Sequence, residues 1–166
     1  MASGDTLLPI SNVHGYEPPA SDYATTGRRN GHNVLEFNTD ADKQADFKLI
    51  MPRHYGGGGV NIYPHFSMAA ATSGDVVLQV QFERLQDGAQ DVDSDGFAAG
   101  QSATIAVPGT AGNVESSNSI SFTNGAQMDS VVAGDLFRLR VTRQESLAGD
   151  TAGDVLQLHA IEVREA

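Results

Sequence analysis

The stretch that most constrains the fold is residues 74–84, where apolar and polar side chains alternate. Leu78, Val80 and Phe82 fall at every second position, and glutamines or a glutamate occupy the positions between and after them. A period of two directs the apolar side chains to one face of an extended chain and the polar ones to the other. The stretch therefore predicts a strand of an antiparallel sheet with one buried and one solvated face. Residues 135–143 repeat the pattern.

Six further segments have the composition of β-strands and are bounded by glycine, proline or polar turns. They are residues 34–38, 46–51, 60–69, 103–107, 120–122 and 154–164. In the last of them the apolar positions change phase, because Leu156 and Leu158 are followed by Ile161 and Val163. A change of phase within a strand predicts a β-bulge, which we place at residues 159–160.

Eight strands with long connections fit two Greek keys, which is the arrangement of a jelly roll. We therefore predict an all-β fold, an eight-stranded antiparallel β-sandwich of jelly-roll type, over residues 34–166. In that topology the two strands described first lie side by side, so that Arg138 and Arg140 face Glu83 and its glutamine neighbours. No long segment carries a clean helical period, and we expect no more than short helical turns.

Residues 1–33 are polar, contain several prolines and glycines, and carry no sustained period. Two interpretations are open: a disordered terminus, or an extended N-terminal arm that becomes ordered on a neighbouring subunit. We favour the arm, because scattered apolar residues joined by Pro and Gly suit a segment that is anchored by contact. Its candidate partner-binding residues are Leu7, Leu8, Ile10, Tyr16, Arg28 and Arg29. Two further candidates, Tyr63 and His65, lie on the polar face of a predicted strand.

The charge balance narrows the classes of partner. The chain has 166 residues and a net charge of −11, from 21 acidic and 10 basic side chains. Such a surface repels phosphate backbones, so we expect no nucleic acid as partner. No apolar run approaches the roughly 20 residues of a membrane helix, and the first residues do not resemble a signal peptide. We expect no membrane partner, and synthesis in a cytoplasm without export by the general pathway.

One acidic loop has the spacing of a cation-binding turn. Asp91, Asp93 and Asp95, followed by Gly96, match the opening of a calcium loop, in which alternate carboxylates surround a hard cation. Ser102 stands at the twelfth position, where a bidentate glutamate belongs, so an EF-hand is excluded. The alternative is a solvated acidic loop. We favour that alternative and predict no metal and no cofactor.

Other motifs that would carry chemistry are missing from the sequence. The chain lacks cysteine, its histidines do not have the spacing of metal ligands, and no serine nucleophile elbow occurs. The glycines at 56–59 are not followed by Lys-Ser or Lys-Thr, so they predict a flexible connection and not a phosphate-binding loop. Aromatic residues make up only 7% of the chain, without Trp, so an aromatic substrate groove is not expected. We predict that the protein is not an enzyme.

Several short motifs resemble those of small virion proteins of tailed bacteriophages. They are residues 29–37 (Arg-Asn-Gly-His-Asn-Val-Leu-Glu-Phe), 51–58 (Met-Pro-Arg-His-Tyr-Gly-Gly-Gly), 72–77 (Thr-Ser-Gly-Asp-Val-Val), 82–84 (Phe-Glu-Arg), 93–98 (Asp-Ser-Asp-Gly-Phe-Ala), 122–130 (Phe-Thr-Asn-Gly-Ala-Gln-Met-Asp-Ser), 133–135 (Ala-Gly-Asp) and 160–165 (Ala-Ile-Glu-Val-Arg-Glu). The resemblance covers most of the chain, and its motifs are structural rather than catalytic.

The resemblance implies a jelly-roll protein on the phage particle. We expect a capsid decoration (cement) protein on the outer surface of the head, bound at junctions between subunits of the major capsid protein. As a homotrimer whose arms cross to neighbouring subunits, it would multiply weak contacts. The alternative is a receptor- or glycan-binding module of a tail or head fibre, because jelly rolls often host lectin sites. For that alternative, Tyr55, Tyr63 and His65 are the candidate aromatic platform.

Overall fold

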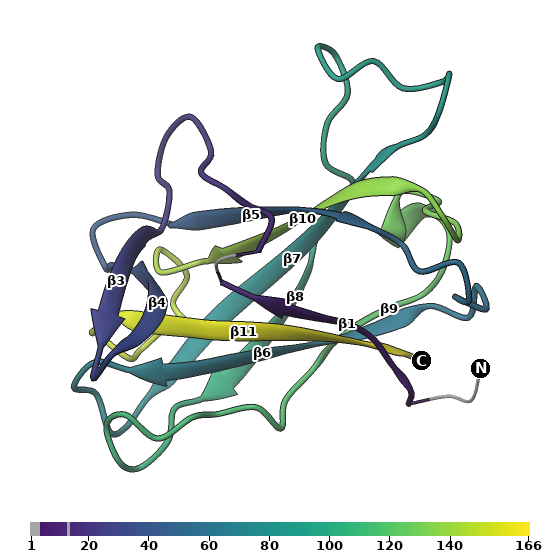
Figure 1. Ribbon diagram of the computed structural model, residues 1–166. Helices are drawn as coiled ribbons and strands as arrows, with labels where there is room; N and C mark the ends of the chain where they lie inside the picture. Colours follow the sequence, from purple (N-terminus) through teal and green to yellow (C-terminus); the bar gives the residue numbers. More distant parts are fainter. Residues whose placement is uncertain (1–3, 13) are drawn as a thin grey trace.

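The computed structural model describes residues 4–12 and 14–166 and shows two antiparallel sheets stacked as a sandwich (Figure 1), with no α-helix among those residues. Sheet A contains β1 (Thr6–Ser11), β3 (Thr25–Arg29), β4 (His32–Phe37), β6 (Val60–Met68), β9 (Ile120–Phe122) and β11 (Leu156–Glu165). Sheet B contains β2 (Tyr16–Glu17), β5 (Gln44–Ile50), β7 (Asp75–Leu85), β8 (Gln101–Ala106) and β10 (Leu136–Arg143). A turn of 3-10 helix, η1 (Ala126–Met128), precedes β10. No described helix is long and apolar enough to cross a membrane.

The strand order confirms the predicted all-β sandwich and each of the eight predicted strands. Sheet A has the order β3-β4-β11-β6-β9, with β1 also paired to β11, and sheet B has the order β2-β5-β10-β7-β8. As predicted, β7 and β10 are neighbours, with Arg138 opposite Glu83 and Arg140 opposite Gln81. Arg138 forms an ion pair with Glu83, whereas Arg140 binds Asp46 of β5 at 2.7 Å.

The core lies between the two sheets and is built by the alternating apolar positions. Phe82 of β7 contacts Phe137 of the neighbouring β10, with ring centroids 5.6 Å apart. The same ring meets Phe122 of sheet A edge to face, at 4.9 Å. All three side chains are buried. Aromatic contacts across the interior therefore join the sheets, at the position that the sequence pattern of residues 74–84 predicts.

The side chain of an arginine is enclosed by this sandwich. Arg143, at the end of β10, is completely buried, and its Nη2 lies 2.8 Å from Oδ1 of Asp150. Its guanidinium also donates to the carbonyl oxygens of Phe37, Ala152 and Asp154. A buried cation is tolerated when it is paired and its donors are satisfied. Arg143 therefore fastens the connection that leads into β11 against the end of β4.

The predicted division into an arm, residues 1–33, and a separate body needs correction. The strands β1, β2 and β3 all belong to the sandwich of their own chain, where they pair with β11, β5 and β4. Leu7 and Ile10 are buried in the core, with 6% and 2% of their surface exposed. Few apolar residues suffice for β1, because β11 supplies its hydrogen-bond partners. Residues 1–3 and 13 of the predicted arm lie outside the described residues.

The long acidic connection between β7 and β8 stands out beyond sheet B in Figure 1. Phe97 lies near its end and covers the arginines of β10. Its ring centroid is 4.0 Å from the guanidinium carbon of Arg140 and 4.9 Å from that of Arg138. Such cation–π contacts add to the ion pairs beneath them. The outer face of sheet B is thus occupied by side chains of the protein itself.

The burial of β1 leads to a prediction about stability. Replacing Ile10 by Ala should lower the free energy of unfolding by about 2–5 kcal/mol, because it removes apolar contacts from the core. The matched change Leu8→Ala, at a partly buried position of the same strand, should cost less. Urea denaturation followed by circular dichroism measures both losses. If Ile10→Ala left the unfolding midpoint unchanged, β1 would not be docked on the sandwich in solution. The interpretation of residues 1–33 as an extended arm would then be favoured again.

Candidate ligand-binding groove

The outer face of sheet A carries polar side chains at alternate positions of its strands. On β6 the odd-numbered positions, among them Tyr63 and His65, face outward, because the even-numbered positions lie in the core. The neighbouring strand β11 sets Glu162 opposite Tyr63 and Ala160 opposite His65. The hairpin of β3 and β4 adds further polar residues on the other side of β11.

A tight turn brings Arg29 and His32 to this face. Asn30 and Gly31 join β3 to β4, and both have a positive φ, of 45° and 85°. Two such residues suit the type I′ turn of a two-residue hairpin, for which Asn-Gly is a preferred sequence. Arg29 and His32 are paired across the hairpin, so their side chains emerge on the same face. Arg29 then reaches Gln157 of β11, to which it donates a hydrogen bond of 2.7 Å.

The guanidinium of Arg29 is held in a confined position. It donates a second hydrogen bond of 2.7 Å to the carbonyl oxygen of Met68 at the end of β6. A Cβ atom added to Gly112, whose φ is +84°, would lie 2.8 Å from Nη2 of Arg29. The positive φ favours glycine at residue 112, and a Cβ atom there would displace the guanidinium of Arg29.

The bulge predicted in β11 is present, and it supplies the centre of the site. The register shifts between Leu158 and Ala160. Leu158 and Ile161 are both buried, so the two residues between them, His159 and Ala160, are directed to the outer face together. The bulge also marks where β11 exchanges β4 for β1 as its neighbour.

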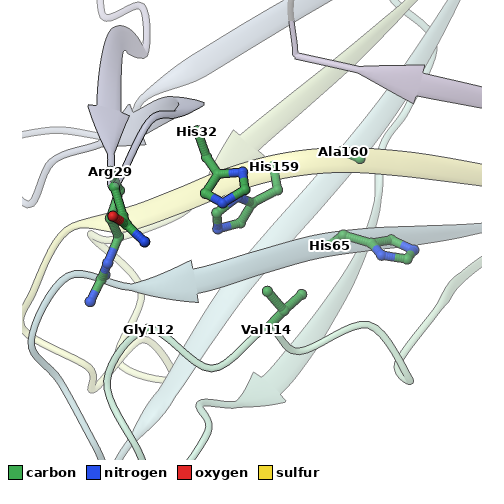
Figure 2. Close-up of a pocket in the computed structure, with 8 residues that line it drawn as sticks. Arg29, His32, His65, Gly112, Val114, His159 and Ala160 are labelled. Atoms are coloured by element: carbon green, nitrogen blue, oxygen red, sulfur yellow. The ribbon is translucent and has the colours of Figure 1, made fainter.

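Two adjoining hollows cross this face, and we call them the sheet A groove. The first has a volume of about 500 Å³ (Figure 2), and its lining residues are Arg29, Asn30, His32, His65, Gly112, Val114, His159 and Ala160. The second, of about 480 Å³, shares His65 and Ala160 with the first and continues beside β1 to His14. Figure 2 shows His32 and His159 toward one end of the first hollow and His65 toward the other. Volumes of this size are typical of small-ligand sites.

A charged cluster borders the second hollow. Oε2 of Glu162 lies 2.9 Å from Arg164 and 3.9 Å from Nε2 of His65. The hydrogen bond from Arg164, followed by one from Thr6, holds the pKa of the Glu162 carboxyl below its usual value. The guanidinium carbon of Arg164 lies 4.7 Å from the ring centroid of Tyr63. Nε2 of His65 is buried and has no hydrogen-bond partner among the described residues.

Ser67 and His159 form a hydrogen bond of 2.9 Å between Oγ and Nε2. A serine beside an imidazole is the arrangement of a nucleophile and its base. Ser67 is completely buried, however, and no carboxylate of the described chain hydrogen-bonds to His159. The contact therefore orients the imidazole. Burial, followed by the charges of His32, Arg29 and His65, lowers the pKa of His159 below its ordinary value.

The predicted partner-binding residues are divided between the groove and the core. Arg29 and His65 line the first hollow, and Tyr63 lies on the same face beneath Arg164. Leu7 and Ile10 are buried among the core residues, and Ile10 also borders the second hollow.

The remaining predicted residues do not join this site. Leu8 and Tyr16 pack partly against the core, and Arg28 is exposed on β3. Tyr55 is buried, and its hydroxyl accepts a hydrogen bond from the backbone of Gly59. The predicted aromatic platform of Tyr55, Tyr63 and His65 is therefore not assembled.

The acidic loop does not gather its carboxylates around one point. Oδ1 of Asp91 accepts the backbone N–H of Asp93 at 3.0 Å, and Oδ1 of Asp95 accepts that of Gly96 at 3.0 Å. Two of the aspartates thus stabilise turns of their own loop. In the described part of the chain, no three His, Asp or Glu side chains form a group that could hold a metal ion.

Two solved structures with a similar fold are carbohydrate-binding modules. The CBM22-2 xylan-binding domain of Paenibacillus barcinonensis Xyn10C matches with a TM-score of 0.53 and 13% identity, over 96% of this chain and 99% of that one. The family 11 carbohydrate-binding module of the cellulosomal cellulase Lic26A-Cel5E of Clostridium thermocellum matches with a TM-score of 0.51 and 10% identity, over 100% of this chain and 97% of that one. At these identities the likeness shows the jelly-roll fold alone. No protein-family model and no curated protein sequence matches the chain.

The environment of His159 predicts a dependence of stability on pH. Its folded-state pKa lies below the unfolded value of about 6.5, so the unfolded chain binds the proton more readily. The stability is therefore fully present above about pH 6.5 and falls as the pH decreases below it. His159→Gln should reduce this loss, whereas His54→Gln, at an exposed position outside the groove, should not. Urea denaturation over a pH series gives the slopes, and an unchanged slope in His159→Gln would contradict the prediction.

Proposed function

We propose that this protein is a non-catalytic carbohydrate-binding module whose ligand lies in the sheet A groove. The observation that carries the proposal is the groove itself, a hollow on the outer face of a jelly-roll sheet, with hydrogen-bonding side chains from four strands. Sugar hydroxyls are both donors and acceptors, so such side chains suit them. The similar folds of a xylan-binding domain and a family 11 carbohydrate-binding module support the proposal.

Recognition in this groove rests on hydrogen bonds more than on ring stacking. The face of Tyr63 is occupied by Arg164, and the groove lining contains imidazoles in place of larger rings. The side chains of His32 and Asn30 are exposed at the rim of the groove. These side chains do not take part in the hydrogen bonds between strands. Val114 supplies an apolar surface for the CH groups of a sugar ring.

The proposal is binding without chemistry. The Ser67–His159 contact is the arrangement in the groove that comes nearest to a catalytic pair, and its serine is closed to a substrate. Most glycosidases also use two carboxyl groups flanking the bond that is cleaved. The first hollow has no Asp or Glu among its described lining residues.

The setting of the module is supported by the sequence resemblance. Motifs within residues 29–165 resemble small virion proteins of tailed bacteriophages, so we place the module on a phage particle, where its ligand is a glycan of the host surface. Decoration of the major capsid protein by a homotrimer stays a prediction, but the arm on which it depended is folded into its own sandwich. The location of the protein in purified particles distinguishes these functions: a glycan-binding module is expected at a fibre, and a decoration protein on the head shell.

Replacing each of two alanines by leucine tests the position of the glycan. Ala160 is shared by both hollows, so Ala160→Leu obstructs the groove and should abolish the retention of bound glycans. Ala106→Leu adds the same side chain at an exposed position of β8 in sheet B and should have no effect. A glycan array identifies ligands, and affinity electrophoresis in a gel containing a retained polysaccharide measures both variants. Equal retention by the two variants, or no glycan retained by the wild type, would contradict the proposal.

A further inference from the structure

The first hollow differs in charge from the rest of the molecule. The protein has a net charge of −11, yet four of the eight lining residues are arginine or histidine: Arg29, His32, His65 and His159. None of the described lining residues is acidic. The charge of Arg29 is permanent, and both of its hydrogen bonds to Met68 and Gln157 end on neutral oxygens. A fixed positive charge beside three imidazoles, in an acidic protein, favours an anionic ligand.

A metal ion does not suit the same residues. In the described structure the imidazoles are not part of any group that could hold a metal. Arg29 would also repel a cation at close range. Nε2 of His65 is buried without a hydrogen-bond partner among the described residues, and its nearest carboxylate oxygen, Oε2 of Glu162, lies 3.9 Å away, beyond hydrogen-bond distance. An unsatisfied buried polar atom of this kind calls for a partner.

We propose that the sheet A groove binds an acidic glycan, with a carboxylate or sulfate group of the sugar seated between Arg29, His32 and His159. The inference rests on the proposed function and specifies its class of carbohydrate. Guanidinium and imidazolium N–H groups donate charge-assisted hydrogen bonds to such oxyanions, which are about twice as strong as neutral ones. The sugar ring that bears the anion then extends past Ala160 toward His65 and the second hollow.

The carboxylates around the groove are already engaged. Glu162 of β11 is bound by Arg164, and Glu36 of β4 accepts a hydrogen bond of 3.2 Å from Gln157. Glu115, on the connection between β8 and β9, accepts hydrogen bonds within its own loop. The strands β3 and β6 contribute no carboxylate. These acids border the site, but their described partners hold them away from the role of counter-ion to Arg29.

Binding of the anion is coupled to protonation of the imidazoles. An oxyanion stabilises the imidazolium form, so its binding raises the pKa of the histidines beside it and takes up protons. The affinity should therefore increase as the pH falls. For one coupled imidazole whose pKa rises by about one unit on binding, the total increase is up to about tenfold.

The test follows the imidazole resonances of the 15N-labelled full chain by NMR. The acidic probes are sodium D-glucuronate and sodium sulfate, and the neutral and ionic controls are methyl glucoside and sodium chloride at matched ionic strength. We expect an acidic probe to raise the titration midpoints of His32 and His159 by about one pH unit. His54, which is exposed outside the groove, serves as the internal control and should not respond to any probe. Glucuronate and sulfate together show whether the site prefers a carboxylate or a sulfate group.

Two variants connect these shifts to the groove. Arg29→Gln removes the permanent charge and should weaken binding of the acidic probe by about tenfold or more. Because Arg29 also supports the end of β6, the exposed residue His32 provides a second variant, His32→Gln, which leaves those contacts intact. It should reduce the dependence of the affinity on pH.

The outcomes separate this inference from the proposed function. Probe-dependent shifts at His32 and His159 that are weakened in Arg29→Gln support the acidic ligand. No shift with either acidic probe, or the same shift at His54 or with chloride, overturns it. A glycan array that retains only neutral glycans would also overturn it and would leave the proposed function standing. Shifts in a protein that retains no glycan would contradict the proposed function and the carbohydrate part of this inference.

Discussion

The strand β11 hydrogen-bonds to three neighbours, and the extra residue between Leu158 and Ala160 makes this possible. Up to Leu158 the strand pairs with β4, and from Ala160 onward it pairs with β1, while β6 follows it on the other side throughout. At the junction the buried side chain of Asn12 donates to the carbonyl oxygens of Asn33 and Leu158. It thereby satisfies backbone groups where one partner strand gives way to the next.

The same bulge determines what the groove contains. Without it, the inward and outward positions of β11 would keep their alternation, and the apolar pair Ile161 and Val163 would face outward. With it, both apolar pairs remain in the core and the outer face gains His159 and Ala160 side by side in sequence. The imidazole supplies a donor and the alanine supplies space. A packing requirement of the core therefore produces the polar, hollow centre of the candidate site.

The sequence predicts the strongly periodic parts of this fold and misses the weakly periodic ones. Eight of the eleven described strands and the bulge follow from alternation, because burial of one face imposes a period of two. The strands of residues 1–33 carry too few apolar residues for that signal, since a strand beside β11 gains its hydrogen bonds from a neighbour that is distant in sequence. One local signal was available: Asn30-Gly31 is a hairpin dipeptide, and it would have joined Arg29 to His32. No local signal brings Gly112 or Val114 to the same hollow.

The arginines on the outer faces of the sandwich differ in how their charges are balanced: Arg164 of sheet A is paired with Glu162, but Arg29 has no acidic partner among its described hydrogen bonds. On sheet B, Arg138 and Arg140 are paired with acidic residues of adjacent strands and lie under Phe97, so their charges are neutralised within the protein. On sheet A, Arg29 is positioned just as firmly, by Gln157 and the approach of Gly112, but by neutral groups. Rigid positioning without neutralisation costs stability in an ordinary surface residue, since the desolvated charge gains no counter-ion. That arrangement is the one expected where the counter-ion arrives with a ligand, and it distinguishes the sheet A groove from the face on the opposite side of the molecule.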